Sequence, residues 1–255
     1  MFYYNPARLA YSSCGATLVD GNDIPQALKR KVVITARHCV NNAATTDGVS
    51  VTFDETPGMV FGNGDRFATS FEGLDEPVYH GSVSYVALGN GDQWFKNDHA
   101  IIILDNAVPE NIVPLPAQLP QLGQAKGTVK SNLTMTGYGT IIWGNSNSTG
   151  LGDVPNGNGN IVGIRDKMTI QMEVISVTNE LILQSMVYAL GDATACNGDS
   201  GSGIVIDGNA GENKPSVILS TVAGGDFACK SLNTSSRVDT QDFKNLLLNT
   251  ISNYQ

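Results

Sequence analysis

Three residues of this chain stand in surroundings that suit nucleophilic catalysis. They are Ser200 in the glycine-rich segment Asn197-Gly198-Asp199-Ser200-Gly201-Ser202-Gly203, His38 in Thr35-Ala36-Arg37-His38-Cys39, and Asp98 just before the apolar run Ala100–Leu104. A serine hydroxyl is a weak nucleophile at neutral pH, so it needs an adjacent base and a group that orients this base. The three motifs therefore offer a nucleophile, a general base and an orienting carboxylate, the set that acyl transfer requires.

Each of these residues has a competitor of the same chemical type. Ser202 lies in the same loop as Ser200, while Asp92 and Asp105 belong to turn-forming clusters. His80 and His99 lack a comparable motif. We expect a loop position for His80 and a structural role beside Asp98 for His99.

Further segments support one interpretation of these motifs. The order along the chain is His, Asp, Ser, and the additional segments are Cys14-Gly15-Ala16-Thr17-Leu18, Met135-Thr136-Gly137-Tyr138-Gly139-Thr140 and Arg237-Val238. Together they resemble the chymotrypsin-like (trypsin-like) serine proteases, from about Cys14 to the end of the chain. The resemblance implies an all-β fold of two antiparallel barrels with a C-terminal helix and an active site between the barrels.

The resemblance also implies a role for each residue of the site. His38 would act as general base and then general acid, Asp98 would orient it, and Ser200 would form an acyl-enzyme with a peptide substrate. The backbone N–H groups of Gly198 and Ser200 would form the oxyanion hole. No cofactor and no metal ion is expected.

Residues around the predicted substrate pocket point away from trypsin specificity. Thr194 matches the position at the base of this pocket, where trypsins have an aspartate that selects Arg or Lys. A threonine cannot supply that charge, so we expect a preference for small or polar side chains. The other predicted substrate-binding residues are Ser220, Thr221, Val222, Ala223, Gly224 and Asn233.

The chain departs from the family pattern at its activation region. Active members usually pair the aspartate before the nucleophile, here Asp199, with a new N-terminus that begins Ile-Val-Gly-Gly, and no such start precedes Cys14. A buried carboxylate needs a partner, and Arg8, Arg30 and Arg37 are the candidates. The alternatives are therefore a zymogen-like form and a catalytically silent homologue that serves as a protein-binding module.

The cysteines bear on the compartment in which the chain works. Cys14, Cys39, Cys196 and Cys229 allow three pairings from the sequence alone. The resemblance selects Cys14–Cys39 and Cys196–Cys229, and two disulfides imply an oxidising, extracellular location. Met1–Arg8 has no charged segment followed by an apolar one, so we expect a mature form without its leader and pro-region.

Composition limits the partners. The net charge is −9 without any Lys/Arg run, which argues against nucleic acid, and no apolar run is long enough to span a bilayer. We expect a monomer that meets protein or peptide substrates and protein inhibitors.

The elements that must hold the site are short strands between Gly, Asn, Asp and Pro clusters. The expected strands are Lys31–Thr35, Val49–Phe53, Ser82–Leu88, Ala100–Leu104, Leu133–Tyr138, Lys167–Val177, Leu181–Val187, Ile204–Ile206 and Ser216–Val222. The proline-rich stretch 114–127 predicts a crossover between an N-terminal half (1–113) and a C-terminal half (128–255). A Gly/Asn-rich surface loop is expected over 144–160, and a helix capped by Asp239 over about 239–252.

Overall fold

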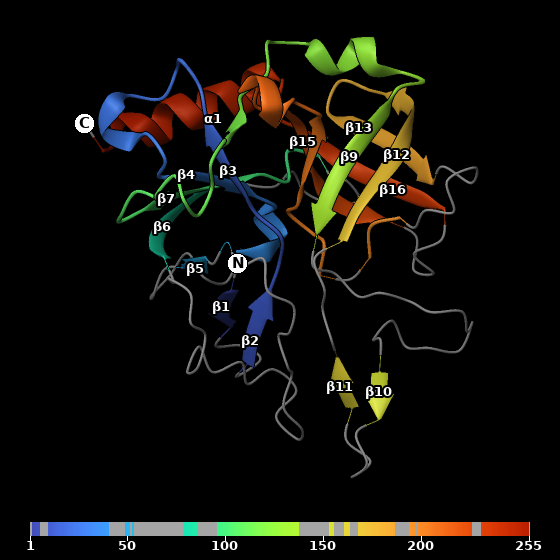
Figure 1. Ribbon diagram of the computed structural model, residues 1–255, viewed down its shortest axis with the longest axis horizontal. Helices are drawn as coiled ribbons and strands as arrows, with labels where there is room; N and C mark the ends of the chain where they lie inside the picture. The colour runs from blue at the N-terminus through green and yellow to red at the C-terminus, as the bar shows by residue number, and fades with distance from the viewer. Residues whose placement is uncertain are drawn as a thin grey trace.

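The computed structural model describes most of the chain (Figure 1). The described residues are 2–5, 10–40, 49–51, 53, 79–85, 96–137, 153–155, 161–163, 168–186, 194–196, 198–225 and 231–254. Within them, no helix is long and apolar enough to cross a membrane.

The first half of the chain forms an antiparallel sheet. Its strands are β1 (Phe2–Asn5), β2 (Ala10–Ser13), β3 (Thr17–Asp20), β4 (Val32–Thr35), β5 (Val49–Val51), β6 (Tyr79–Tyr85) and β7 (Ala100–Leu104), in the order β3-β4-β7-β6-β5-β1-β2. Every residue of β4 and β7 is buried. Side chains alternate along a strand, so Val33 and Ile102 enter one core cluster while Ile34 and Ile101 enter the cluster on the opposite face.

The second half forms a closed barrel of six antiparallel strands. They are β9 (Asn132–Gly137), β12 (Met168–Val177), β13 (Leu181–Met186), β14 (Gly203–Ile206), β15 (Val217–Gly225) and β16 (Leu232–Arg237). The order is β14-β9-β12-β13-β16-β15, and pairing of β14 with β15 closes the ring. Leu133, Met172, Ile182 and Leu219 fill its interior. With the sheet of the first half, this barrel is consistent with a chymotrypsin-like double-barrel fold.

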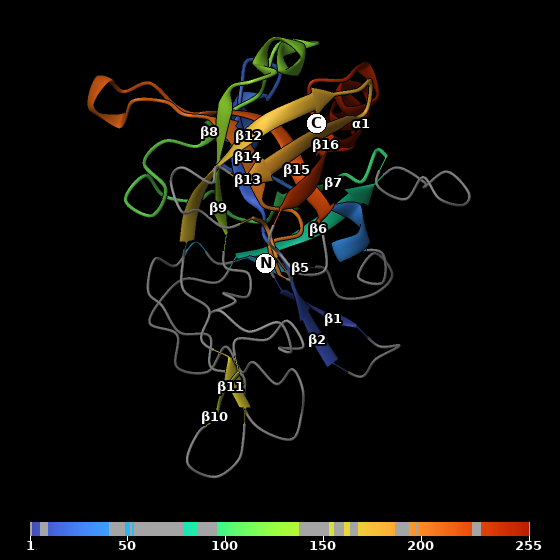
Figure 2. The ribbon, with the colours of Figure 1, turned by 90° about the vertical axis from the view of Figure 1, so that its right-hand side faces the viewer.

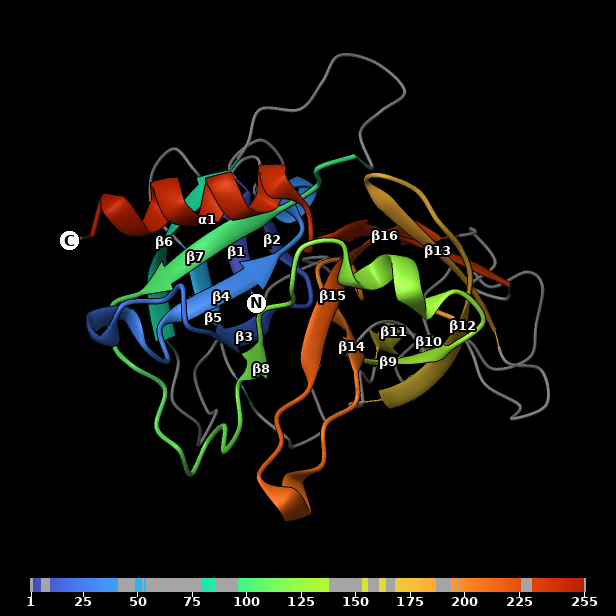
Figure 3. The same cartoon turned by 90° about the horizontal axis from the view of Figure 1, so that it is seen from above.

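Two elements join the halves. The short strand β8 (Ala117–Gln118) runs parallel to both β3 and β15, so it links the first sheet to the barrel. Helix α1 (Gln241–Ser252) follows the last barrel strand but lies across the first sheet (Figures 1 and 3). Phe243 and Leu247 of this helix pack into the same core cluster as Ile34 and Ile101.

Most of the expected strands are present with small shifts in their ends. The parts of the expected strands that lie outside the described residues are Thr52, 86–88, Tyr138, Lys167 and Val187. His80 lies in β6 and not in a loop, because β6 begins three residues earlier than its expected start at Ser82. The helix begins at Gln241, and its cap is Thr240, whose hydroxyl accepts the Phe243 N–H at 3.2 Å. Asp239 does not cap it, because its carboxylate pairs with Arg237.

The Gly/Asn-rich segment contains one strand that composition did not predict. Within 144–160, Asp153–Pro155 forms β10, which pairs with β11 (Ile161–Gly163); the rest of this segment lies outside the described residues. The pair forms a two-stranded sheet of its own, seen apart from the other strands in Figures 1 and 2. The boundaries proposed for the two halves and the crossover remain predictions.

Candidate active site

His38 and Asp98 meet because of the pairing between β4 and β7. Thr35, the last residue of β4, lies opposite Ala100, the first residue of β7. The chain continues from β4 into a 3-10 turn over Arg37–Cys39 that carries His38, while Asp98 immediately precedes β7. Two long-separated segments are thereby placed at the same end of one strand pair.

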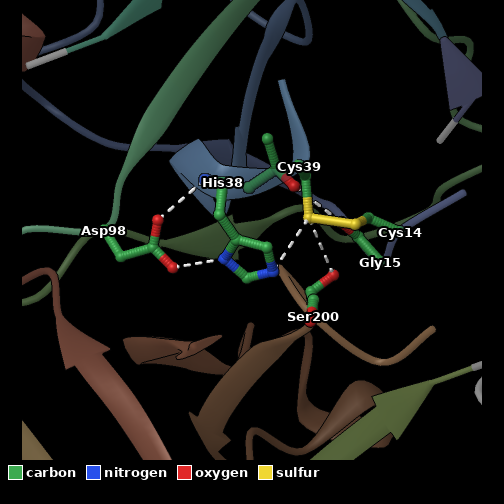
Figure 4. Close-up of a disulfide and its surroundings, with 7 residues drawn as sticks. Cys14, Gly15, His38, Cys39, Asp98 and Ser200 are labelled. Carbon is green, nitrogen blue, oxygen red and sulfur yellow. Dashed lines mark hydrogen bonds and ion pairs between the residues drawn. A yellow bond between two sulfur atoms is a disulfide. The ribbon is translucent and has the colours of Figure 1, made fainter. Parts of the chain in front are cut away.

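The carboxylate of Asp98 holds the histidine at two points (Figure 4). Its Oδ2 lies 2.6 Å from His38 Nδ1, and its Oδ1 accepts the backbone N–H of His38 at 2.8 Å. Asp98 has no exposed side-chain surface, whereas the His38 side chain is 30 % exposed. A carboxylate in this position favours the tautomer of neutral imidazole that is protonated on Nδ1 and unprotonated on Nε2.

Ser200 lies in a tightly packed loop near this histidine. Gly201 has φ of 83°, and a Cβ on it would lie only 2.2 Å from Thr35 Oγ1. The Gly15 N–H donates to the carbonyl of Ser200 at 2.8 Å, while the Gly201 N–H donates to the Val222 carbonyl at 2.8 Å. The loop is thus hydrogen-bonded to both halves of the chain. Figure 4 shows Ser200 beside His38, on the side of the ring that faces away from Asp98.

The backbone before Ser200 adopts a positive φ angle at Gly198, as a turn whose N–H groups bind an anion can require. Gly198 has φ of 98°, a conformation that residues with a Cβ rarely adopt. Within the described part of the chain, we find no hydrogen bond from the N–H groups of Gly198 and Ser200. Both N–H groups could therefore donate hydrogen bonds to the oxyanion of a bound substrate.

Asp199 points into the protein behind this turn. It is 5 % exposed, and its Oδ2 accepts the backbone N–H of Cys196 at 2.9 Å. Its Oδ1 lies against Gly137, where a Cβ would be only 2.1 Å from that oxygen. Of the three candidate arginines, Arg30 is hydrogen-bonded to the carbonyls of Val108, Pro109 and Val113 instead, and Arg8 lies outside the described residues. A pairing of Asp199 with Arg37 remains a prediction.

A disulfide lies directly beside the histidine. Cys14 and Cys39 are bonded to each other, as the resemblance implied. Cys39 Sγ lies 3.8 Å from His38 Nε2 and 3.6 Å from the Ser200 carbonyl oxygen. Cys196 is also disulfide-bonded, and its expected partner Cys229 lies outside the described residues. The described residues offer one cluster of metal-ligand types, Cys14, His38 and Cys39, but sulfurs joined in a disulfide provide no thiolate.

The residues of β15 that we expect to contact substrate differ in how their backbones are bonded. Ser220 and Thr221 are fully buried, and pairing with β14 and β16 occupies both of their backbone edges. Their backbone edges are therefore already used by neighbouring strands, and a role for them in substrate binding remains a prediction. Val222 is bound to Gly201 and Ser202 through its backbone, so the segment 223–225 follows directly after the residue that anchors the Ser200 loop.

The other expected pocket residues are buried as well. Thr194 is 4 % exposed, and its hydroxyl lies 3.4 Å from the Ala195 carbonyl oxygen. Asn233 has no exposed surface and donates from Nδ2 to Gln184 Oε1 at 2.8 Å. Asn233 also lies opposite Gly225 in the β15–β16 pair. Sequence reasoning did not identify Gly15, Gly137 or Gln184 as parts of this environment, because each acts through tertiary contacts rather than a local motif.

His99 is a buried neutral histidine next to the site. It is 1 % exposed, its ring packs edge-on against Phe243 with centroids 5.2 Å apart, and its Nδ1 lies 3.4 Å from Thr221 Oγ1. Burial lowers the pKa of His99 to about 4, and this effect outweighs the nearby charge of Asp98 and the backbone of Arg237, which favour protonation.

This histidine predicts a loss of stability in mild acid. The unfolded chain takes up a proton on His99 near pH 6.5 but the folded chain only near pH 4, so stability falls as the pH drops through this window. The loss should reach about 3 kcal/mol of unfolding free energy. Urea unfolding at several pH values should show it in the natural chain and not in His99→Gln. Equal pH dependence in both proteins would refute this role.

No curated protein matches the chain. The family model Trypsin matches residues 6–240, which include all three motifs discussed above and every described strand except β1, and which end just before α1. Most of the chain is covered by this match, and its fold agrees with it. The chain therefore belongs to the trypsin family.

Proposed function

We propose that the chain is an active serine endopeptidase with Ser200, His38 and Asp98 as its catalytic residues. Trypsin-family proteins are chymotrypsin-fold serine peptidases that act on proteins or peptides. The observation that carries the proposal for this chain is the His38–Asp98 pair, with 2.6 Å between Nδ1 and Oδ2 and Ser200 on the opposite side of the ring. Such a pair supplies an oriented base to an otherwise weak nucleophile.

The geometry supports a two-step reaction. His38 Nε2 takes the proton of the Ser200 hydroxyl as Oγ attacks the substrate carbonyl, and Asp98 stabilises the imidazolium that forms. The N–H groups of Gly198 and Ser200 bind the oxyanion of the tetrahedral intermediate. His38 then passes its proton to the leaving amine, which gives the acyl-enzyme. In the second step, His38 activates a water molecule that releases the acid product.

Substrate is proposed to bind along the segment 223–225. Gly224 and Gly225 pair with β16 on one edge, and no strand within the described residues pairs with their other edge, where a substrate strand could be added. Thr194, at the expected base of the pocket, brings no carboxylate, so cleavage after Arg or Lys is not expected. Asn233 lies opposite Gly225 in the β15–β16 pair, and we expect a polar residue at this position to favour small or polar substrate residues. The buried Ser220 and Thr221 support this segment from behind.

The cellular setting is part of the same proposal. The Cys14–Cys39 disulfide and the disulfide-bonded state of Cys196 suit an oxidising compartment, so we propose a secreted monomer. Its partners would be protein or peptide substrates and inhibitors that imitate them.

A fluorophosphonate probe tests this function directly. The probe reacts with an activated serine and needs no matching peptide sequence. We expect a single adduct on Ser200 by intact mass and peptide mapping, and no adduct in His38→Ala. Absence of labelling on the folded natural chain would instead support the zymogen-like or catalytically silent alternatives. An adduct on Ser202 would reassign the nucleophile.

A further inference from the structure

We propose that reduction of the Cys14–Cys39 disulfide converts the active site into a zinc site that captures His38. The potential ligand atoms of Cys14, His38 and Cys39 all lie within 4.8 Å of one another. In the oxidised protein the two sulfurs are bonded to each other and bind no metal. A dithiol reductant would supply two electrons and two protons, become a disulfide itself, and leave two thiols beside the imidazole.

The spacing fits a tetrahedral zinc ion. Zinc–sulfur bonds of about 2.3 Å and zinc–nitrogen bonds of about 2.0 Å place a thiolate and an imidazole nitrogen on one ion about 3.6 Å apart. Cys39 Sγ and His38 Nε2 are separated by 3.8 Å. Breaking the disulfide also allows the sulfurs to separate to the about 3.8 Å that two thiolates span on one zinc ion. Binding releases the two thiol protons to solvent.

The surroundings of His38 match those of a zinc-binding histidine. Such a histidine usually donates its other ring N–H to a carboxylate, which fixes the ring and strengthens the ligand. Asp98 Oδ2 already holds His38 Nδ1 at 2.6 Å. The His38 side chain is 30 % exposed, which gives the ion an entry path, and a water molecule would complete the fourth position.

The donor set selects the ion. Two thiolates and one imidazole suit Zn²⁺ and its analogue Co²⁺, whereas Mg²⁺ and Ca²⁺ prefer oxygen ligands. Because the metal would occupy Nε2, the nitrogen proposed to activate Ser200, the zinc form could not hydrolyse peptides. This consequence for hydrolysis depends on the proposed function, but the metal site does not.

Cobalt spectroscopy tests the site without any assay of activity. The protein is reduced with dithiothreitol, freed of it by gel filtration under argon, and titrated with Co²⁺ alone. We expect one equivalent to give the thiolate charge-transfer and tetrahedral d–d bands, and Zn²⁺ to displace them. Oxidised protein should give neither. Asp98→Asn should weaken binding by about 10- to 100-fold.

Variants separate this site from other thiols. Reduced Cys14→Ala and His38→Ala both keep the thiol of Cys196, but each lacks one proposed ligand, so each should lose at least tenfold in affinity and shift the d–d bands. Unchanged binding in His38→Ala, or no bands in the reduced natural chain while it stays folded, would overturn the proposal. If reduction unfolds the chain, one equivalent of Zn²⁺ should restore its near-ultraviolet circular dichroism; failure to do so would overturn the proposal too.

The effect on hydrolysis has a separate readout. Zn²⁺ should block fluorophosphonate labelling of the reduced protein, and a chelator should restore it, whereas oxidised protein should label equally with and without Zn²⁺. Cobalt binding without labelling in any form would leave the metal site standing while the proposed peptidase function fails. Labelling that Zn²⁺ does not affect, in a protein that binds cobalt, would refute capture of His38.

Discussion

Replacing Ser200 with alanine should lower peptide hydrolysis by about 10⁴- to 10⁶-fold, because the remaining histidine and oxyanion donors have no nucleophile to assist. The loop should keep its fold. Its anchors are the backbone bonds from Gly15 to the Ser200 carbonyl and from Gly201 to the Val222 carbonyl, and none of them uses the serine hydroxyl. Initial rates on a casein substrate, together with thermal unfolding curves, measure both parts of this expectation.

Ser202→Ala is the matched control in the same loop. Ser202 is 2 % exposed, and its backbone bonds join Asp199 and Val222. Its Oγ packs against Gly15, where a Cβ would lie 2.0 Å away. Removing this hydroxyl should leave hydrolysis within about tenfold of the natural chain, since a packing change of one atom is small. A larger loss of hydrolysis in Ser202→Ala than in Ser200→Ala would indicate that Ser202, and not Ser200, is the nucleophile.

Asp239→Asn should lower the free energy of unfolding by about 3–5 kcal/mol, the usual effect of breaking a buried ion pair. Arg237 Nε and Nη2 donate to the two Asp239 oxygens at 2.8 and 2.9 Å, and both residues are 2 % exposed. Asp239 Oδ2 also accepts the Ala125 N–H at 2.6 Å. An asparagine keeps the size of the side chain but leaves the guanidinium charge buried without a counter-charge.

An exposed ion pair provides the control. Lys244 Nζ and Asp23 Oδ2 are 3.2 Å apart, with side chains 36 % and 47 % exposed. Because solvent screens such pairs, Lys244→Ala should change stability by at most about 1 kcal/mol. Urea unfolding monitored by circular dichroism gives both values. If Asp239→Asn shifts the midpoint no more than Lys244→Ala does, the buried pair contributes little to the fold.

The parts of the fold that could be predicted are those coded by local apolarity. The runs around Ile34 and Ile101 predict strands because they are continuously apolar, and the structure buries both of these strands on both faces. Strand β16 was not predicted, since its sequence Leu-Asn-Thr-Ser-Ser-Arg is polar. Four of its six residues are nevertheless buried. Asn233 and Ser235 hydrogen-bond to Gln184, and Ser235 accepts from Ser220. Partners this distant in the sequence leave no local signal.

In the candidate site, too, the residues in local motifs could be predicted, whereas those that depend on tertiary contacts could not. The nucleophile, base and carboxylate could be proposed because each stands in a short motif with characteristic neighbours. The substrate-binding residues remain predictions, because the register between β14 and β15 decides which residues face the site, and register depends on pairing rather than on a local motif. The cap of α1 was misassigned for a related reason: Asp239 is held by Arg237, so the next residue, Thr240, caps the helix.

The position of α1 also constrains the order in which the molecule can assemble during synthesis. Phe243, Leu247 and Ile251 complete a core whose other side is built by Val32, Ile34 and Ile101, more than 130 residues earlier in the chain. The first sheet therefore emerges from the ribosome with an apolar face uncovered. Its core closes only after the helix has been made, so the half that carries His38 and Asp98 should acquire its final packing last.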